Sequence, residues 1–184
     1  MRPMTEAETK VVFAKLANYT SNSLGDLIRP LEDGDSYVFR VIKDRVYYVL
    51  KSIANLAVSI KRDALASTGI CLGKFTKSGK FRLHITALPI LSAHARYKIW
   101  IKPNGVNPFL YGSHISKAHV GRWTEDTPAN VGVLIYDMAD TPLGFGVSAR
   151  STGDARRLDP TGIVVFRQAD CGEYLRDEDT LFAG

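Results

Sequence analysis

The stretch GKFTKSGKFRLHIT, residues 73–86, decides how the first half of the chain folds, because its turn can close in two ways. A two-residue loop at Ser78-Gly79 would mix apolar and charged side chains on both sides of a hairpin. A three-residue loop that ends at Gly79 is a type I turn followed by a residue of positive φ, which glycine adopts readily. This second loop pairs Phe75 with Phe81 and separates the apolar from the charged side chains. It is therefore the predicted register.

The two faces of this hairpin differ in character in the predicted register. One face is apolar and consists of Cys71, Phe75, Phe81, Leu83 and Ile85. The opposite face is expected in solvent and consists of Lys74, Thr76, Lys80, Arg82 and His84, with Lys77 at the tip. Such a cationic face can hold an acidic polymer, or it can simply be a solvated surface that keeps a sheet from pairing with others. The sequence leaves both interpretations open.

The positive charge of the chain is concentrated in its middle third. The 184 residues carry a formal net charge of +5. Residues 61–122 hold eleven lysines and arginines, one acidic residue and all four histidines, whereas residues 123–184 hold five basic and eleven acidic residues. A field concentrated in this way attracts polyanions. The charge distribution favours a nucleic-acid partner.

The start of the chain has the signature of an amphipathic helix. Thr5 and Glu8 have the spacing of a capping box. Apolar residues then recur at helical spacing, which predicts a helix over residues 6–18 with Val12, Leu16 and Tyr19 on its buried face. Residues 21–35 are polar and rich in turn formers, and they predict a loop or a broken helix.

A hairpin and a second helix are predicted next. The β-branched and aromatic runs 37–42 and 46–49 are joined by the short link Lys43-Asp44-Arg45, which is typical of a hairpin. Ser52 is a candidate N-cap for a helix with one apolar face, formed by Ile53, Leu56, Ala57 and Ile60.

From Tyr97 onward the helical periodicity fades. Short apolar runs separated by glycine and proline replace it, at residues 98–102, 109–111, 131–136, 143–148 and 163–166. This pattern is typical of a small β-barrel or sandwich. A domain boundary is expected near residues 92–96.

No pattern for catalysis, a cofactor or a metal is found in the sequence. GFGVSA, residues 144–149, matches a dinucleotide-binding motif, but a loop rather than a helix is expected after it. His114 and His119 lack further zinc ligands at a suitable spacing. The acidic residues near the end suggest a solvated surface or a patch for a basic partner protein; they are Asp170, Glu173, Asp177, Glu178 and Asp179. No enzyme activity, cofactor or metal is therefore expected.

Further features of the sequence indicate where in the cell the protein is expected. There is no run of about 18 apolar residues and no apolar core behind the basic residue at the N-terminus, so neither a membrane span nor a secretory signal is expected. Two cysteines, Cys71 and Cys171, lie a hundred residues apart, and an intracellular, reduced protein is the better interpretation.

Residues 97–102 have the alternation of a strand that could contact RNA. Lys98 and Lys102 share one face with Trp100, which is either a stacking platform for an unpaired base or a tryptophan of the barrel core. Lys117 and Arg122 follow a glycine turn, and a pair of arginines lies at 156–157. Exposed cations of this kind contact phosphates.

Six blocks of the sequence together resemble one family. They are TEAETKVVFAKLANY, KDRVYYV, GICLGKFTKSGKFRLHITAL, YKIWIKPNGVNPFLYGSHISKAHVGR, DTPLGFGVSARST and TGIVVFRQADCGEYLRDEDTL. The chain closely resembles, over essentially its whole length, the Nip-seven family of large-ribosomal-subunit biogenesis factors. The resemblance implies an α+β fold in which an N-terminal antiparallel sheet with helices, residues 1–93, is followed by a small, mostly-β PUA pseudo-barrel, residues 94–184.

The resemblance also implies a function. It implies a non-enzymatic nucleolar factor for pre-ribosomal RNA processing and 60S subunit assembly, which binds RNA and other assembly proteins of pre-60S particles and is a monomer outside the particle. In PUA domains the segment after the first strand and the closing strand frame the RNA groove, which points to Lys117, Arg122, Arg150 and Arg167. The alternative is an adaptor between proteins of the particle with little direct RNA contact. Whether the hairpin or the PUA domain dominates RNA affinity stays open.

Overall fold

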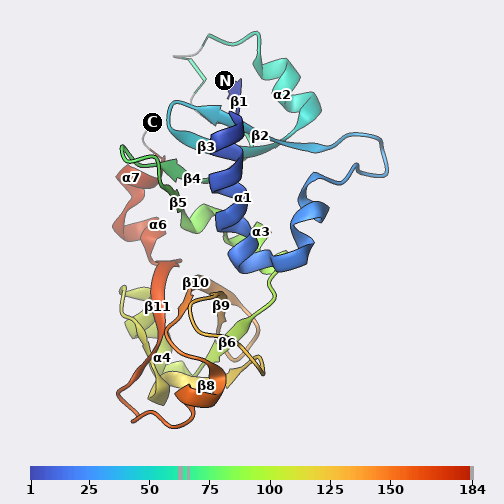
Figure 1. The fold of residues 1–184 in the computed structure, drawn as a ribbon. Coiled ribbons are helices and arrows are strands. Elements are labelled where there is room, and N and C mark those ends of the chain that lie inside the picture. Colours follow the sequence, from blue (N-terminus) through green and yellow to red (C-terminus); the bar gives the residue numbers. More distant parts are fainter. Residues whose placement is uncertain (62–63, 66, 183–184) are drawn as a thin grey trace. The chain divides into compact units, whose positions relative to one another are not determined.

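The computed structural model describes residues 1–61, 64–65 and 67–182 (Figure 1). The chain divides into two compact units, one up to Ala87 and the other from Leu88 onward. The division lies a few residues before the boundary expected from composition, because helix α3 (Leu88–Ala93) packs on strand β10 of the second unit. No helix in the described part of the chain is long and apolar enough to cross a membrane.

The first unit contains a five-stranded antiparallel sheet in the order β1-β2-β3-β4-β5. Its strands are β1 (Arg2–Pro3), β2 (Tyr37–Ile42), β3 (Arg45–Leu50), β4 (Ile70–Phe75) and β5 (Phe81–Leu83). The predicted hairpin is confirmed as β2–β3, and its loop is one residue shorter than the predicted link. Ile42 pairs with Arg45, and Lys43 takes a positive φ of 56° in the two-residue turn.

Helix α1 (Glu6–Thr20) confirms the prediction for the start of the chain. The Glu8 amide donates to the Thr5 hydroxyl at 3.3 Å, and the Thr5 amide donates to the Glu8 carboxylate at 2.8 Å, which is the capping box. Arg2 forms an ion pair with the same carboxylate at 2.6 Å, and this contact, with the Thr5 bonds, lowers the pKa of Glu8 to about 2. The irregular stretch that follows is a 3₁₀ helix, η1 (Ser21–Ile28).

The second helix, α2 (Lys51–Ala57), buries only part of the predicted face. Ala54 and Ala57 are buried, whereas Ile53 and Leu56 are exposed. The helix begins directly after β3, so the strand rather than a cap at Ser52 sets its start; the Ser52 hydroxyl donates to Asp35 instead. Small side chains let the helix lie close to β2 and β3, and this packing overrides the apolar periodicity.

The β4–β5 hairpin has the predicted register. Phe75 pairs with Phe81, and the Gly79 amide donates to the Thr76 carbonyl while Gly79 takes a φ of 75°. The predicted solvent face is wrong at one residue, because His84 is buried. β5 ends at Leu83 and the chain turns into the 3₁₀ helix η2 (Ile85–Ala87), so strand alternation no longer applies at His84.

The second unit contains a six-stranded sheet in the order β7-β11-β10-β9-β6-β8. Its strands are β6 (Lys98–Ile101), β7 (Ile115–Ser116), β8 (Val120–Trp123), β9 (Gly132–Tyr136), β10 (Pro142–Ser148) and β11 (Ile163–Asp170). β6 and β9 are parallel, and the other pairs are antiparallel. The sheet is nearly closed like a barrel, as expected of a mostly-β unit.

Short helices complete the second unit. They are α4 (Pro103–Leu110), η3 (Lys117–His119), α5 (Thr152–Ala155), α6 (Glu173–Arg176) and α7 (Glu178–Phe182). Two expectations are corrected here. Residues 109–110 end a helix rather than forming a strand, and a one-turn helix, α5, follows the glycine-rich strand β10. A dinucleotide-binding motif requires parallel strands on either side of the helix. β10 pairs antiparallel with both neighbouring strands, so the motif at residues 144–149 does not form such a site.

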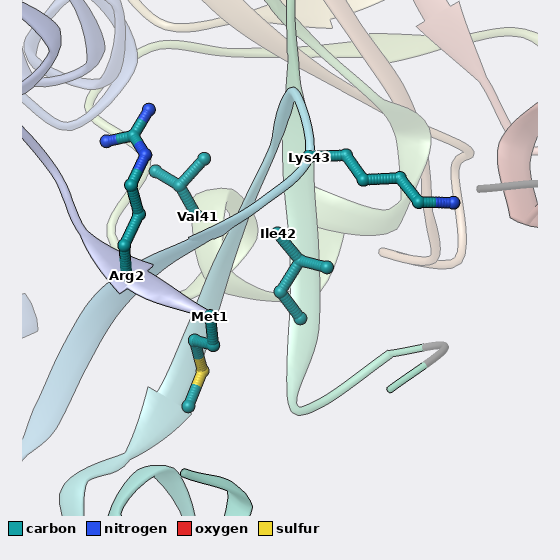
Figure 2. Close-up of a pocket in the computed structure, with 5 residues that line it drawn as sticks. All are labelled: Met1, Arg2, Val41, Ile42 and Lys43. Atoms are coloured by element: carbon teal, nitrogen blue, oxygen red, sulfur yellow. The ribbon is translucent and has the colours of Figure 1, made fainter. Parts of the chain in front are cut away.

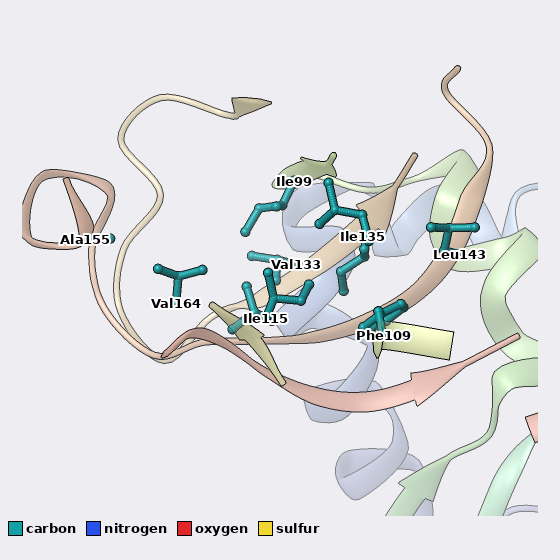
Figure 3. Packing of buried hydrophobic residues seen from close by; sticks show 10 residues of the cluster. Ile99, Phe109, Ile115, Val133, Ile135, Leu143, Ala155 and Val164 are labelled. Atoms are coloured by element: carbon teal, nitrogen blue, oxygen red, sulfur yellow. The ribbon is translucent and has the colours of Figure 1, made fainter. Parts of the chain in front are cut away.

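The apolar core of the second unit lies inside the curved sheet (Figure 3). Ile99, Val133 and Ile135 point inward from β6 and β9, and Phe109 enters from α4. Because Ile99 alternates with Lys98 and Trp100 along β6, burying the isoleucines fixes the lysine and the tryptophan on the outer face. The core therefore orients the outer-face residues described below.

Candidate nucleic-acid interface

The hairpin patch consists of Lys74, Lys77, Lys80 and Arg82. Lys77, Lys80 and Arg82 are exposed and Lys74 is half-buried. In the described ranges none of the four forms an ion pair with a carboxylate. Lys74 lies directly opposite Arg82 in the β4–β5 pairing. Like charges at directly opposed positions of a sheet are destabilising, so the pairing of Lys74 with Arg82 lowers the stability of the hairpin.

His84 lies beneath this patch rather than on it. Burial, and then the positive charges of Arg45, Lys74 and Arg82, lower the pKa of His84 to about 4. The imidazole is therefore neutral at physiological pH and adds no charge to the patch. Its Nδ1 atom has no hydrogen-bond partner among the described residues.

The strand ladder is a second candidate surface, on the outer face of the second sheet. It consists of Lys98, Trp100, Arg122, Tyr136 and Asp140. Trp100 on β6 pairs with Arg122 on β8 and, on its other side, with Tyr136 on β9. Three neighbouring strands thus place a guanidinium, an indole and a phenol in one row.

The contacts within the strand ladder are close. The Arg122 guanidinium carbon lies 3.9 Å from the centroid of the Trp100 ring, and the Trp100 and Tyr136 rings stack with centroids 5.8 Å apart. Asp140 accepts a hydrogen bond from the Trp100 indole nitrogen at 2.5 Å and lies 3.6 Å from Arg122. The Lys98 ammonium lies 5.5 Å from the Tyr136 ring. The tryptophan is only partly buried, so it is not a residue of the barrel core.

Two other predicted cations, Lys102 after β6 and Lys117 in η3, donate hydrogen bonds to backbone carbonyls. Lys102 is exposed, and its ammonium donates weakly to the Ala118 carbonyl at 3.3 Å. The Lys117 ammonium donates to the carbonyls of Arg156 and Leu158, at 2.7 and 2.5 Å. Lys117 therefore holds the chain that follows α5, and only part of its charge is available to a ligand.

The two predicted arginines, Arg150 after β10 and Arg167 in the closing strand β11, differ in their contacts. Arg150 is exposed where β10 ends, before α5, and its position leaves it available. Arg167 is committed to carboxylates, because it contacts Asp170 at 2.6 Å and Glu173 at 2.8 Å. Asp170 is fully buried, and it accepts a second arginine, Arg176, at 2.9 Å.

We name Arg167, Asp170, Glu173 and Arg176 the ion cluster. Arg176 also donates to the carbonyl of Leu110 at the end of α4. Burial raises the pKa of Glu173, and Arg167 opposes that shift. The hydrogen bond from Arg176 to Asp170 raises the pKa of the guanidinium. The ion cluster joins α4, β11 and α6. Two of the five acidic residues near the end of the chain, Asp170 and Glu173, are buried in it and do not belong to the acidic surface.

Sequence reasoning missed Tyr136 and Asp140. Tyr136 joins the strand ladder only through the parallel pairing of β6 with β9, which has no local signal. Asp140 takes a φ of 63° in the turn after β9, a conformation in which aspartate is enriched among non-glycine residues. The turn residues near 137–142 mark a loop in the sequence, but they do not show that its carboxylate reaches Trp100.

The pocket beside strands β1 and β2 lacks catalytic side chains, and the described residues form no metal cluster. A cavity of about 220 Å³ is lined by Met1, Arg2, Val41, Ile42 and Lys43 (Figure 2). The Arg2 and Lys43 side chains extend away from one another, and the lining holds no acid or nucleophile. In the same described ranges, no three His, Cys, Asp or Glu residues gather as metal ligands.

Comparison with known proteins accounts for both units. The model of the NIP7/UPF0113 pre-PUA domain matches residues 1–85, and that of the UPF0113 PUA domain matches residues 97–179. The fold is similar to that of a hypothetical protein from Pyrococcus horikoshii, with a TM-score of 0.59 over 96% of this chain and 98% of the other at 13% identity. A PUA-domain protein from Aeropyrum pernix K1 has a TM-score of 0.57 over 95% of this chain and 87% of the other, also at 13% identity.

The two units thus define a protein in which a pre-PUA domain precedes a PUA domain. The chain is 62% identical to the 60S ribosome subunit biogenesis protein NIP7 of Saccharomyces cerevisiae, over 99% of each chain. It is 55% identical to the NIP7 homolog of Danio rerio, over 98% of this chain and 99% of the other. The chain belongs to the NIP7 family of 60S ribosome subunit biogenesis proteins, which confirms the resemblance found in the sequence.

Proposed function

We propose that this protein binds pre-ribosomal RNA directly and supports 60S subunit assembly by binding and positioning, without catalysing a reaction. The relatives are named as biogenesis proteins, and the second unit is a PUA domain. The observation that carries direct RNA binding is the hairpin patch. Its cations lack carboxylate partners in the described ranges and keep two like charges opposed, an arrangement that a polyanion would stabilise.

The experiment is a salt titration of RNA affinity. Fluorescence anisotropy measures the binding of a labelled oligo(U) RNA of about a dozen nucleotides, which exceeds most sites for single strands. If about four cations contact phosphates, the logarithm of the affinity falls with the logarithm of the salt concentration with a slope of about −3. A slope near zero, or no binding at low salt, would overturn direct RNA binding.

A second candidate function is that of an adaptor between assembly proteins with little RNA contact. The exposed apolar side chains of Ile53 and Leu56 on α2, with Val58 and Ile60 just beyond it, favour this candidate. Large apolar side chains grouped in solvent are a mark of protein-binding surfaces. The salt titration separates the two candidates, because an adaptor of this kind gives no salt-dependent RNA affinity.

We further propose that the protein works in the nucleolus within pre-60S particles and is a monomer outside them. Membership in a family of 60S biogenesis proteins supports this location. Microscopy of a fluorescently tagged chain and sedimentation with pre-60S particles test the location. Light scattering of the purified protein tests the monomer, and a mass near 20.3 kDa is expected.

A further inference from the structure

The row of planar groups in the strand ladder ends at an edge of the sheet. The order of the strands is β9, β6, β8, and β8 is the last of the sheet. Tyr136, Trp100 and Arg122 follow the same order from the interior of the sheet to this edge. Trp100 therefore has a neighbour on both sides, whereas Arg122 has one neighbouring plane and one side beyond the last strand.

The inner part of the row is held in place. Lys98 covers Tyr136, the indole hydrogen bond to Asp140 fixes the rotation of Trp100, and the same carboxylate draws Arg122 toward the ring. A guanidinium held flat on an indole keeps its second face and its in-plane N–H donors available. This arrangement suits a ligand that brings another flat ring together with an anionic group.

We propose that the outer face of Arg122 is a stacking subsite for one unpaired base of RNA. The base extends the row Tyr136–Trp100–Arg122, and the neighbouring phosphate is bound by the free N–H groups of Arg122 and by Lys102. This inference rests on the proposed RNA-binding function and assigns it a particular position. Stacking on arginine planes is a common way to bind single-stranded RNA.

The charges around the row favour RNA over a protein as the ligand. Of the three cations Lys98, Lys102 and Arg122, only Arg122 forms an ion pair with a carboxylate of the described residues, that of Asp140, so the surface keeps an excess of positive charge. Lys102 is exposed and only weakly bonded, which leaves it able to reach a phosphate beside the stacked base. A protein partner would have to bring both an aromatic side chain and an acidic one to the same place.

The test separates stacking from charge. Arg122→Lys keeps the positive charge but removes the flat guanidinium. Arg29→Lys is the matched control, because it makes the same exchange at an exposed arginine outside the strand ladder. Oligo(U) is compared with an oligonucleotide of the same length that lacks its bases but keeps its phosphates. We expect Arg122→Lys to weaken oligo(U) binding about tenfold, the scale of one lost base stack, with an unchanged salt slope. Binding of the abasic strand should not change.

Tryptophan fluorescence reports on the row directly. The chain has two tryptophans, and Trp123→Phe leaves Trp100 as the sole reporter. Oligo(U) should quench its emission and the abasic strand should not, since only a base added next to Arg122 alters the surroundings of the indole. Thermal unfolding curves establish that each variant is folded before its affinity is compared.

The possible results separate the base subsite at Arg122 from the proposed RNA binding. If oligo(U) binds with the expected salt slope but Arg122→Lys binds as tightly and Trp100 emission is unchanged, the subsite is overturned and the proposed RNA binding stands. If no RNA binds the unmodified protein, the proposed function fails first. If Arg122→Lys instead releases an assembly protein in pull-downs while RNA affinity is unchanged, the row is a protein contact and the inference is overturned.

Discussion

The hairpin patch and the ion cluster show that cationic side chains can have opposite roles. The hairpin patch has four cations on a surface ribbon, and no carboxylate of the described residues forms an ion pair with them. In the ion cluster two arginines lie against a carboxylate with no exposed surface. The first arrangement presents charge to a ligand at a small cost in stability. The second uses charge to join three elements of the PUA domain, so Arg167 is a structural residue before it can be an RNA contact.

The largest expected effect comes from breaking the ion cluster. Asp170→Asn keeps the shape of the side chain but leaves two arginines facing a neutral amide. Removing one partner of a buried ion pair lowers stability by about 3 kcal/mol. Urea unfolding measures this loss, and Asp179→Asn, which changes an exposed acid further along the chain, is the control with little effect. An equal loss in both variants would mean that the cluster is not structural.

The second prediction concerns the hairpin patch and should change affinity rather than stability. Reversing Lys74, Lys80 and Arg82 to glutamate removes three phosphate contacts, and we expect RNA affinity to fall about a hundredfold near physiological salt. The melting temperature should stay within a few degrees, since the side chains lie at the surface.

The matched control for this prediction reverses three exposed cations elsewhere in the first unit, Lys10, Arg29 and Lys51. It changes the net charge equally, so it removes long-range attraction but no local contact. If both triple variants lose the same affinity, the protein attracts RNA by net charge alone. If the hairpin variant no longer melts cooperatively, its cations support the fold and the contrast with the ion cluster disappears.

The smallest effect should come from His84, the residue beneath the hairpin patch. Its pKa is about 4 in the folded chain, below the ordinary value of 6.5, so folding favours the neutral imidazole. The associated stability is complete above about pH 6.5 and is lost as the pH falls from there toward about 4. Glu8, whose pKa is about 2, loses its contribution below that window.

Urea unfolding of the protein between about pH 7 and pH 4.5 measures this dependence. His84→Gln should flatten the curve over the window relative to the unmodified protein. Comparing the slopes of the variant and the unmodified protein cancels the contributions of the carboxylates that both share. Equal slopes would show that the buried imidazole does not govern the pH dependence.

Local signals in the sequence predicted much of the fold. The capping box at Thr5 and Glu8, the register fixed by Gly79 and the alternation along β6 each depend on neighbours a few residues away, and each was confirmed. On α2 the burial of Ala57 was predicted correctly, but Ile53 and Leu56 are exposed because packing against two strands favours small side chains. His84 was misplaced because strand alternation ended one residue earlier.

The candidate site was less predictable for a physical reason. A basic residue in a sequence shows its charge but not its partner. Lys117 donates to carbonyls about forty positions away, and Arg167 depends on an acid whose burial follows from the ion cluster. Trp100 was recognised as a candidate platform, yet its stacking partner Tyr136 comes from a parallel strand pairing, which no short motif specifies.

The edge position of β8 sets a limit on the shape of an RNA that uses the row of planar groups. No strand lies beyond β8, so no further side chain of the sheet continues the row past Arg122. The protein therefore offers one base position there. A base that has left its own stack, as at a bulge or the end of a strand, suits such a single position. The protein would then select RNA by an interruption in its helix rather than by its sequence.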